Sequence, residues 1–418
     1  MKLTNLTYSM DLQLFAYNPQ AQPENHTGAA TLSVEDKEYY DKHLIRYAEP
    51  NLVHRQFGQK RPIPQGNGSK AEFRCFASLG KQTTPLVEGV TPDGQTLSVT
   101  KVEATVYQYG GFVNLTDKIR LTSIDPIVTE TVRLIGDQAG LTMDTIVRDV
   151  LNTGKNFAYA SSIVDGVETE AHFRHELDEN CKLTVKEVEK QVTELRSQNA
   201  PTFEGGYYIC IAHPKSLFDL MRDKDWREPQ QYTSEVTKIF KGEVGEIGGC
   251  RFIKSTESKV FKGSNLGTES RTLSITTVSG KTVNVSNTDL VADSLNGRCV
   301  IINGNRYDVE SNTDKAITLT SEIKGEVGAG ALVYPGEGGK NGCAVFSNLF
   351  IAQDAYGVVD IEGGGLETII KPLGSGDDPL NQRSTVGWKG YETAVILVPQ
   401  YLRRLETAGS YANSADAN

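Results

Sequence analysis

The sequence predicts an α+β fold from which a two-stranded arm projects, and three observations support this prediction. A long run of alternating residues between Lys60 and Asp117 has the period of half-buried strands. Apolar residues at helical spacing follow Asp125, and a Thr-, Val- and Gly-rich segment of short strands begins near Lys262. At 418 residues the chain suits two or three domains and can bury a substantial core.

The projecting arm is the feature that most constrains function. Its two strands cover residues 71–77 and 95–106, with a turn region rich in Pro and Gly between them. The second strand continues to Val113 and would span about 60 Å, whereas a domain of ordinary size has a radius of gyration near 15 Å. Because an isolated hairpin is marginally stable in water and this one has no evident core of its own, we expect another copy of the chain to cover it. The predicted subunit-interface residues are Phe73, Arg74, Phe76, Leu97, Val99, Tyr107 and Tyr109.

Composition excludes several classes of protein. The net charge of -10 argues against a dedicated nucleic-acid binder, which would carry a basic face. No run of about 18 apolar residues predicts a membrane span, and the first 20 residues lack the pattern of a signal peptide. The six cysteines lie far apart without a CxxC pair, so we expect reduced thiols rather than disulfides or a zinc site. We expect a protein that is made in a cytoplasm and is soluble there.

Three helices have recognisable start signals. The longest begins with Asp125 as cap and Pro126 at the first helical position, and Gly154 can end it. Its predicted buried stripe is Val128, Thr131, Ile135, Ala139, Met143, Ile146 and Val150, flanked by Ile127, Leu134 and Val147. A second helix starts at a capping box of Thr184 and Glu187, with Val185, Val188, Val192 and Leu195 buried and Pro201 as its stop. A short helix after Ser33 is indicated by the spacing of Tyr40, His43, Leu44 and Tyr47.

The remaining strands predict a second unit with a small β structure inserted into it. Residues 207–212 read as a buried strand, and His213 and Pro214 open a short helix. Residues 262–342 predict a small barrel or sandwich, in which Asn303-Gly304 signals a type I′ hairpin. The flanks at 244–256 and 343–351 are expected to continue one unit. Strands at 366–370, 386–388 and 393–398 precede a small polar tail.

No motif supports catalysis or cofactor binding. Gly363-Gly364-Gly365 is followed by a strand-like segment rather than a helix start, so a flexible turn is the better interpretation than a phosphate-binding loop. His172 and His175 could share a metal on a helix, but the HExxH order and a third ligand are missing, and an exposed connector is favoured. His213 is expected to be a turn residue. We therefore predict no catalytic residue, no cofactor and no metal.

Several short segments, taken in their order along the chain, resemble one protein family. The chain resembles a tailed-phage major capsid protein of the Hong Kong 97-like fold, in the subfamily typified by the coliphage N-four capsid protein. The segments that carry the likeness are residues 55–60, 83–94, 108–111, 136–140, 148–152, 356–358, 362–367, 378–383 and 385–389. Residues 10–16 resemble a start found in phage structural proteins from Gram-positive hosts.

The resemblance implies a division of the chain. The implied parts are an N-terminal arm (1–56), an E-loop hairpin (57–117), a P-domain with a spine helix (118–182), an A-domain (183–261), an inserted β domain (262–342), and a return to the A- and P-domains (343–418). It also implies hexamers and pentamers in an icosahedral shell around double-stranded DNA, held without sequence-specific binding and without a membrane. A separate scaffolding protein and a portal are the implied partners, and the virion capsid, assembled in the host bacterial cytoplasm, is the implied location.

Three alternatives stay open beside the phage capsid shell. An encapsulin-like nanocompartment would have the same fold, and a cargo enzyme inside the particles would favour it. A virion surface protein could bind a receptor or carbohydrate through residues 262–342. An enzyme would depend on His172 and His175. Covalent crosslinking through Lys70 or Lys81, known in some members of the fold, is weighed against ordinary solvated lysines on the hairpin.

Overall fold

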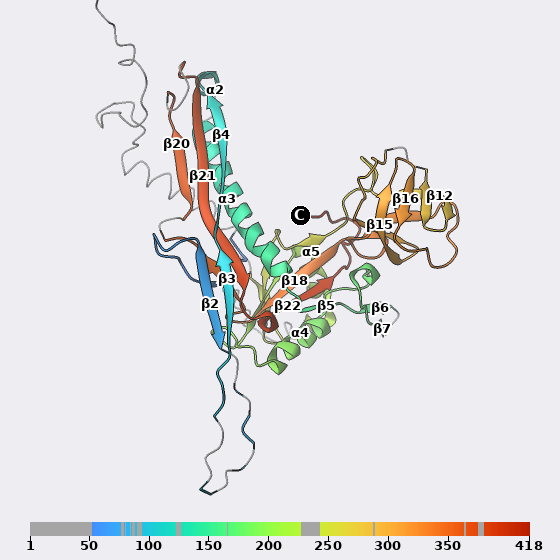
Figure 1. The fold of residues 1–418 in the computed structure, drawn as a ribbon, viewed down its shortest axis with the longest axis horizontal. Helices are drawn as coiled ribbons and strands as arrows, with labels where there is room; N and C mark the ends of the chain where they lie inside the picture. The colour runs from blue at the N-terminus through green and yellow to red at the C-terminus, as the bar shows by residue number, and fades with distance from the viewer. Residues whose placement is uncertain are drawn as a thin grey trace, which may run out of the picture.

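A computed structural model describes most of residues 52–418. The gaps in this description are 77–78, 80, 84, 86–87, 90–93, 123–126, 165, 227–242, 287–288, 363–364 and 375–379. The predicted N-terminal arm and the helix after Ser33 therefore lie outside the described residues, as do Asp125 and Pro126. Figure 1 shows a tall sheet backed by a long helix, a second sheet beside it, a barrel at one side and an arm that projects below. No helix among the described residues is long and apolar enough to cross a membrane.

The long helix α3 (Ile127–Asn152) confirms the predicted spine, at about 39 Å for its 26 residues. Of the predicted stripe, Thr131, Ile135, Ala139 and Met143 are buried, together with Val147 from its flank. Leu134, which was predicted to flank the stripe, is 58% exposed. Gly136 and Gly140 also belong to the buried face of the helix.

The tall five-stranded sheet is built around one long strand. Strands β1 (Gln59–Lys60), β19 (Tyr356–Val359), β21 (Arg383–Ile396) and β20 (Glu367–Lys371) follow in that order, and β4 (Tyr107–Thr116) also pairs with β21. The predicted strands at 386–388 and 393–398 are thus a single strand of 14 residues. One face packs against α3, where Trp388 Nε1 donates a hydrogen bond to Gln138 Oε1 over 3.2 Å.

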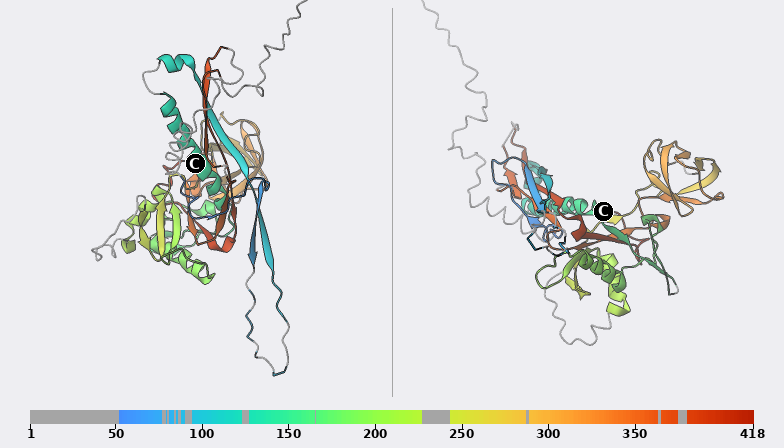
Figure 2. Two further views of the ribbon diagram at one scale, coloured as in Figure 1. Left: turned by 90° about the vertical axis from the view of Figure 1, so that its left-hand side faces the viewer. Right: turned by 60° about the horizontal axis from the view of Figure 1, so that its bottom comes forward.

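The arm is an antiparallel hairpin of β2 (Lys70–Phe76) and β3 (Val99–Thr105). The expected single strand through Val113 is divided at Val106, whose side chain is buried and whose N–H donates to Ser69 O. Past that residue the chain leaves β2 and pairs with β21 instead. The hairpin points away from the rest of the molecule, as the two further views make clear (Figure 2).

The second sheet has seven strands and joins the two flanks of the barrel. In order they are β5 (Phe157–Tyr159), β22 (Leu402–Thr407), β18 (Val345–Ile351), β8 (Tyr208–Ala212), β10 (Cys250–Lys254) and β9 (Glu243–Ile247), with β11 (Val260–Phe261) also on β18. Every residue of β8 and β18 is buried. Strand β22 was not predicted, since its charged residues hide the pattern of a buried strand.

Helices α4 (Val185–Ser197) and α5 (Pro214–Arg222) start where the sequence predicts. The Thr184 side chain accepts from the N–H of Glu187, and His213 Nδ1 accepts from the N–H of Lys215. The four residues predicted to be buried on α4 are buried. Shorter elements are α2 (Asp117–Thr122), β6 (Ser162–Val164), β7 (Val167–Thr169) and the 3-10 turns η3 (Arg174–Glu176), η4 (Lys340–Gly342) and η5 (Pro399–Tyr401).

The β-rich segment forms a closed six-stranded barrel with its own apolar core. Its strands are β12 (Leu273–Ser279), β13 (Thr282–Val285), β14 (Cys299–Ile302), β15 (Asn305–Asn312), β16 (Ala316–Leu319) and β17 (Leu332–Pro335). Asn303 and Gly304 have φ of 49° and 76°, which confirms the predicted type I′ turn. Closure of the barrel leaves no strand edge unpaired.

The predicted small polar tail contacts the rest of the protein at several points. Ala412 and Ala415 are buried, and Asn418 Oδ1 accepts a hydrogen bond of 2.9 Å from the N–H of Val260. Small side chains allow this segment to lie close to β11 and β18. All six cysteines are free thiols.

Replacing Thr184 by Ala should lower the free energy of unfolding of the second sheet by about 1 kcal/mol, because the N–H of Glu187 loses its acceptor. Urea denaturation followed by circular dichroism measures the change. Thr193→Ala, on the exposed face of the same helix, is the matched control and should not destabilise. Equal effects of the two substitutions would contradict the capping role.

Candidate assembly surfaces

The base of the arm has a core of its own, contrary to the expectation from the sequence. Ala71 and Phe73 of β2 and Ala104 of β3 are buried in a cluster with Ile63 and Val359. Phe73 is only 6% exposed, and its ring lies so close to β19 that a Cβ at Gly357 would be 2.7 Å from it. Phe73 is therefore covered by its own chain in the isolated subunit, and its predicted contact with a neighbouring subunit stays a prediction.

The opposite face of the hairpin is charged near the base. Glu72 faces Glu103 across the two strands, and Lys101 Nζ lies 2.8 Å from Glu72 and 2.9 Å from Glu103. Arg74 Nε is 2.6 Å from Glu72. Hydrogen bonds from Lys101 and then Arg74 lower the pKa of Glu72 below its usual value. The two cations thus offset the repulsion between facing carboxylates, and Arg74 is exposed but already paired.

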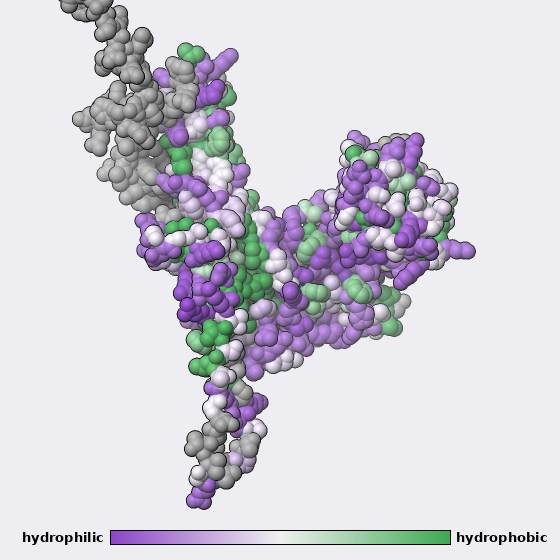
Figure 3. Space-filling view, in the orientation of Figure 1, coloured by the Kyte–Doolittle hydropathy of each residue, from purple (hydrophilic) through white to green (hydrophobic). Residues whose placement is uncertain are grey.

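Farther along the arm, apolar side chains face solvent. Phe76 is 64% exposed, Leu79 55%, Leu97 68% and Val99 46%. These four residues, called the distal patch here, lie where the β2–β3 ladder ends at the pair Phe76–Val99. Green colouring at the root of the projecting loop shows the apolar surface in Figure 3. Single exposed apolar residues are ordinary, but four together on a projecting arm indicate an interaction surface.

The structure separates the two predicted tyrosines. Tyr107 is 59% exposed at the start of β4. Tyr109 is partly buried against the cluster between β21 and α3. Of the seven predicted interface residues, Phe76, Leu97, Val99 and Tyr107 therefore present apolar surface to solvent.

A buried polar joint fixes the root of the arm. The N–H of His54 donates to Asp144 Oδ1 over 2.7 Å, His54 Nδ1 lies 2.6 Å from Asp144 Oδ2, and both side chains are fully buried. The Tyr356 hydroxyl donates to the carbonyl of His54. Because Asp144 belongs to α3 and Tyr356 to β19, this joint ties the start of the arm to both elements. Sequence patterns did not reveal it, since His54 and Asp144 lie in unrelated segments.

Arg55 extends the joint to β21. Its Nη2 lies 2.9 Å from Asp360 Oδ2, and its Nε lies 3.0 Å from Glu392 Oε1. Glu392 is 2% exposed, and loss of hydration raises its pKa to about 7 although Arg55 acts in the opposite direction. The Glu392 carboxyl group therefore changes from protonated to ionised near neutral pH, and burial destabilises its ionised form.

A second buried ion cluster holds the last strand of the other sheet. Arg174 makes two hydrogen bonds to Glu406, of 2.6 and 2.7 Å, and Arg404 Nε lies 3.0 Å from the same carboxylate. The Arg174 guanidinium also stacks on Phe261, 3.7 Å from the ring centroid. These contacts connect η3, β11 and β22 beside the entry to the barrel, and they explain how a charged strand can be buried.

The three histidines that were considered for metal binding or catalysis take part in turns, helix capping and ring stacking. Glu176 accepts hydrogen bonds from the N–H groups of His172 and Phe173, and His175 stacks on Phe173. His213 caps α5 and stacks on Phe346. Within the described ranges, no three His, Cys, Asp or Glu side chains are grouped to hold a metal. Gly363 and Gly364 lie outside the described residues.

Comparison with known proteins agrees with this arrangement. Residues 127–302 match a family model described as phage capsid protein. No curated protein matches the chain. The solved capsid of cyanophage P-SCSP1u is similar at a TM-score of 0.51 and 13% identity, covering 86% of this chain and 89% of that one. The capsid of Ralstonia phage GP4 is similar at 0.51 and 14% identity, over 100% of both chains.

These findings show a fold shared with phage capsid proteins. With the family match, they support function as a major capsid protein, a structural and non-enzymatic role in a multimeric shell. The family match begins at the first residue of α3 and ends at the last residue of β14, so it includes part of the barrel.

Replacing Glu392 by Gln should remove a pH dependence at the root of the arm. Since the folded pKa of about 7 lies above the unfolded value of about 4.5, the wild-type protein loses stability as pH rises between these values, by up to about 3 kcal/mol. Hydrogen exchange of β19 and β21 amides, corrected for intrinsic rates, should show protection that falls from pH 5 to 8 in wild type.

In the Glu392→Gln variant the corrected protection should change much less over that range. Glu310→Gln, on the exposed side of the barrel, is the control and should behave as wild type. A wild-type profile that is flat from pH 5 to 8 would contradict the raised pKa.

Proposed function

We propose that this chain is the shell subunit of a tailed double-stranded DNA phage, with a Hong Kong 97-like fold of the subfamily typified by the coliphage N-four capsid protein. In this proposal β2–β3 is the E-loop, α3 with the five-stranded sheet is the P-domain, and the seven-stranded sheet is the A-domain. Subunits form hexamers and pentamers. The virion capsid is assembled in the bacterial cytoplasm with a separate scaffolding protein and a portal, and it encloses DNA without sequence-specific contacts.

The distal patch carries the proposal. Phe76, Leu79, Leu97 and Val99 project beyond the core that buries Phe73, so their own subunit leaves them uncovered. Full burial of a large apolar side chain contributes about 1.5–3 kcal/mol, which suits the many weak and repeated contacts of a closed shell. A neighbouring copy is the occupant that repeats with the same geometry at every position.

A second candidate function, receptor or carbohydrate binding at the virion surface, is favoured by one observation. The barrel closes on its own core and is joined to the second sheet through β11 and β18. Such a module can project from a shell as an insertion. Deleting residues 264–336 in the phage should then abolish adsorption while shells still form, and unchanged adsorption would reject this candidate.

The double variant Phe76→Ser with Leu97→Ser should impair assembly without unfolding the subunit, since both side chains are exposed in the isolated chain. Losing about 3–6 kcal/mol per contact should raise the protein concentration needed for assembly at least about 100-fold. Sedimentation over a concentration series measures this threshold.

Val291→Ser is the matched control, because Val291 is 58% exposed between β13 and β14 of the barrel, and Figure 1 shows the barrel well away from the arm. It should assemble as wild type does. Normal assembly of the double variant, with unchanged circular dichroism in both proteins, would contradict a role of the distal patch in contacts between subunits.

A further inference from the structure

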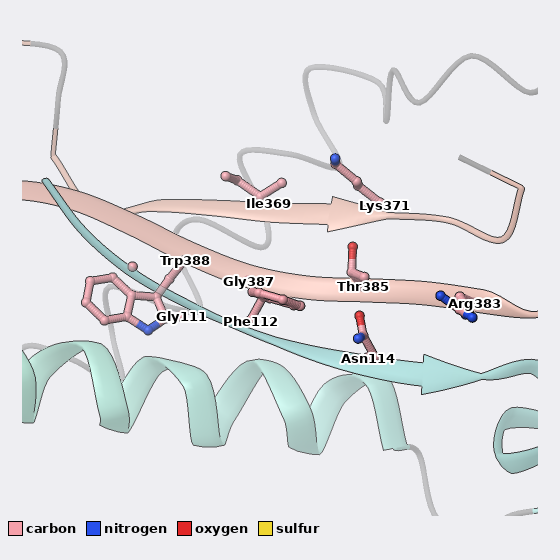
Figure 4. A pocket seen from close by; sticks show the side chains of 10 residues that line it. Gly111, Phe112, Asn114, Ile369, Lys371, Arg383, Thr385, Gly387 and Trp388 are labelled. Carbon is pink, nitrogen blue, oxygen red and sulfur yellow. The ribbon is translucent and has the colours of Figure 1, made fainter. Parts of the chain in front are cut away.

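The barrel meets the rest of the protein at a narrow junction. The tall sheet differs in this respect, since Figure 4 shows α3 running along β4 and β21. The barrel is joined through two short connections, residues 262–265 after β11 and residues 336–339 after β17. Beside the junction, a cleft of about 530 Å³ is lined by Arg306 and Asp308 of the barrel and by Phe173 next to η3. This cleft leaves room for the barrel to move unless the junction holds it.

The second connection has the composition of a flexible hinge. Residues 335–339 read Pro-Gly-Glu-Gly-Gly, and glycine-rich segments are flexible when nothing packs on them. In the structure, the three glycines of this segment are nevertheless buried. A Cβ at Gly336 would lie 2.7 Å from the carbonyl carbon of Cys299, and a Cβ at Gly263 of the first connection would lie 1.8 Å from Pro335 Cβ. The two connections are therefore packed against each other.

Arg298 ties the two connections together with its whole guanidinium group. Its Nε donates a hydrogen bond of 3.1 Å to Glu337 Oε1 in the second connection. Its Nη1 and Nη2 donate hydrogen bonds of 3.0 Å to the carbonyls of Asn265 and Ser264 in the first connection. The backbone of Arg298 is held within the barrel, where its carbonyl accepts from the N–H of Val309. A planar guanidinium can serve these three acceptors at once because its donors form a rigid fork.

We propose that Arg298 is a positioning residue that fixes the barrel in one orientation relative to the seven-stranded sheet. The far ends of both connections are already anchored beside that sheet. Strand β11 pairs with β18, and the N–H of Lys340 donates to Leu177 O over 2.8 Å. Arg298 closes the junction from the barrel side, so the glycine-rich connection cannot act as a hinge and the cleft keeps its shape. This inference does not depend on the proposed function.

Hydrogen exchange of the full-length protein, measured by mass spectrometry, tests the proposal. Arg298→Gln should speed exchange of the amides of residues 336–340 about tenfold or more, because their hydrogen bonds lose the support of the closed junction. Exchange in the β12–β13 and β15–β16 ladders should stay at the wild-type rate. Arg306→Gln is the matched control, since Arg306 lies 3.6 Å from Asp308 of its own strand, and it should leave the junction unchanged.

Cleavage by a glutamyl endopeptidase separates an open junction from an unfolded barrel. The Arg298→Gln variant should be cut after Glu337 faster than the wild-type protein, because the following residue is buried while the junction is closed. Cleavage after Glu310, within β15, should stay as slow as in the wild-type protein.

A second variant keeps the test decisive if Arg298→Gln does not fold. Glu337→Ala frees the second connection but keeps the contacts of Arg298 with the two carbonyls, and it should also speed exchange of residues 336–340. Wild-type exchange of this segment in both variants would overturn the proposal. Exchange that rises equally in the barrel ladders would also overturn it, because Arg298 would then support the fold of the barrel rather than its orientation.

Discussion

The pairing of β21 with β4 is the interaction on which the rest of the structure depends. Ten residue pairs, from Arg383–Thr116 to Glu392–Tyr107, join segments from opposite halves of the chain. The same strand also bonds β19 and β20 and packs against α3. At Gly390 the Met143 side chain of α3 lies close against the strand, since a Cβ there would lie 2.5 Å from the Met143 methyl group. The arm and its polar joint both take their positions from this strand.

The tall sheet holds the root of the arm rigidly, whereas the distal patch of the arm stays exposed. Buried polar groups are costly unless they are paired, so the contacts of His54 and Arg55 with Asp144, Asp360 and Glu392 fix one geometry at the root. Beyond the root, the charged ladder and then the distal patch face outward. An arm held this way presents its apolar surface at a defined place, which is what repeated contacts between identical subunits require.

Local signals made much of the fold predictable from sequence. Thr184, His213 and Asn303-Gly304 each act through neighbouring backbone groups, so their roles could be read without knowing the tertiary structure. The alternation of side chains along a strand would also have placed Phe73 and Phe76 on different faces of the arm. Residues three apart in a strand lie on opposite faces, and only one of the two faces the core.

Features that depend on distant partners were not predictable. Strand β22 looks polar until Glu406 is placed between Arg174 and Arg404. Leu134 looks like a core residue by its apolar character, but only the packing of α3 on the sheet decides that it stays 58% exposed. The joint between His54 and Asp144 needs two segments that only the fold brings together.

Sedimentation of the purified wild-type protein, with and without the products of its neighbouring genes, followed by electron microscopy, tests the central claim most directly. The account predicts uniform closed shells of hundreds of copies, in which density for β2–β3 of one subunit lies against another subunit. A small monodisperse oligomer under both conditions would contradict it.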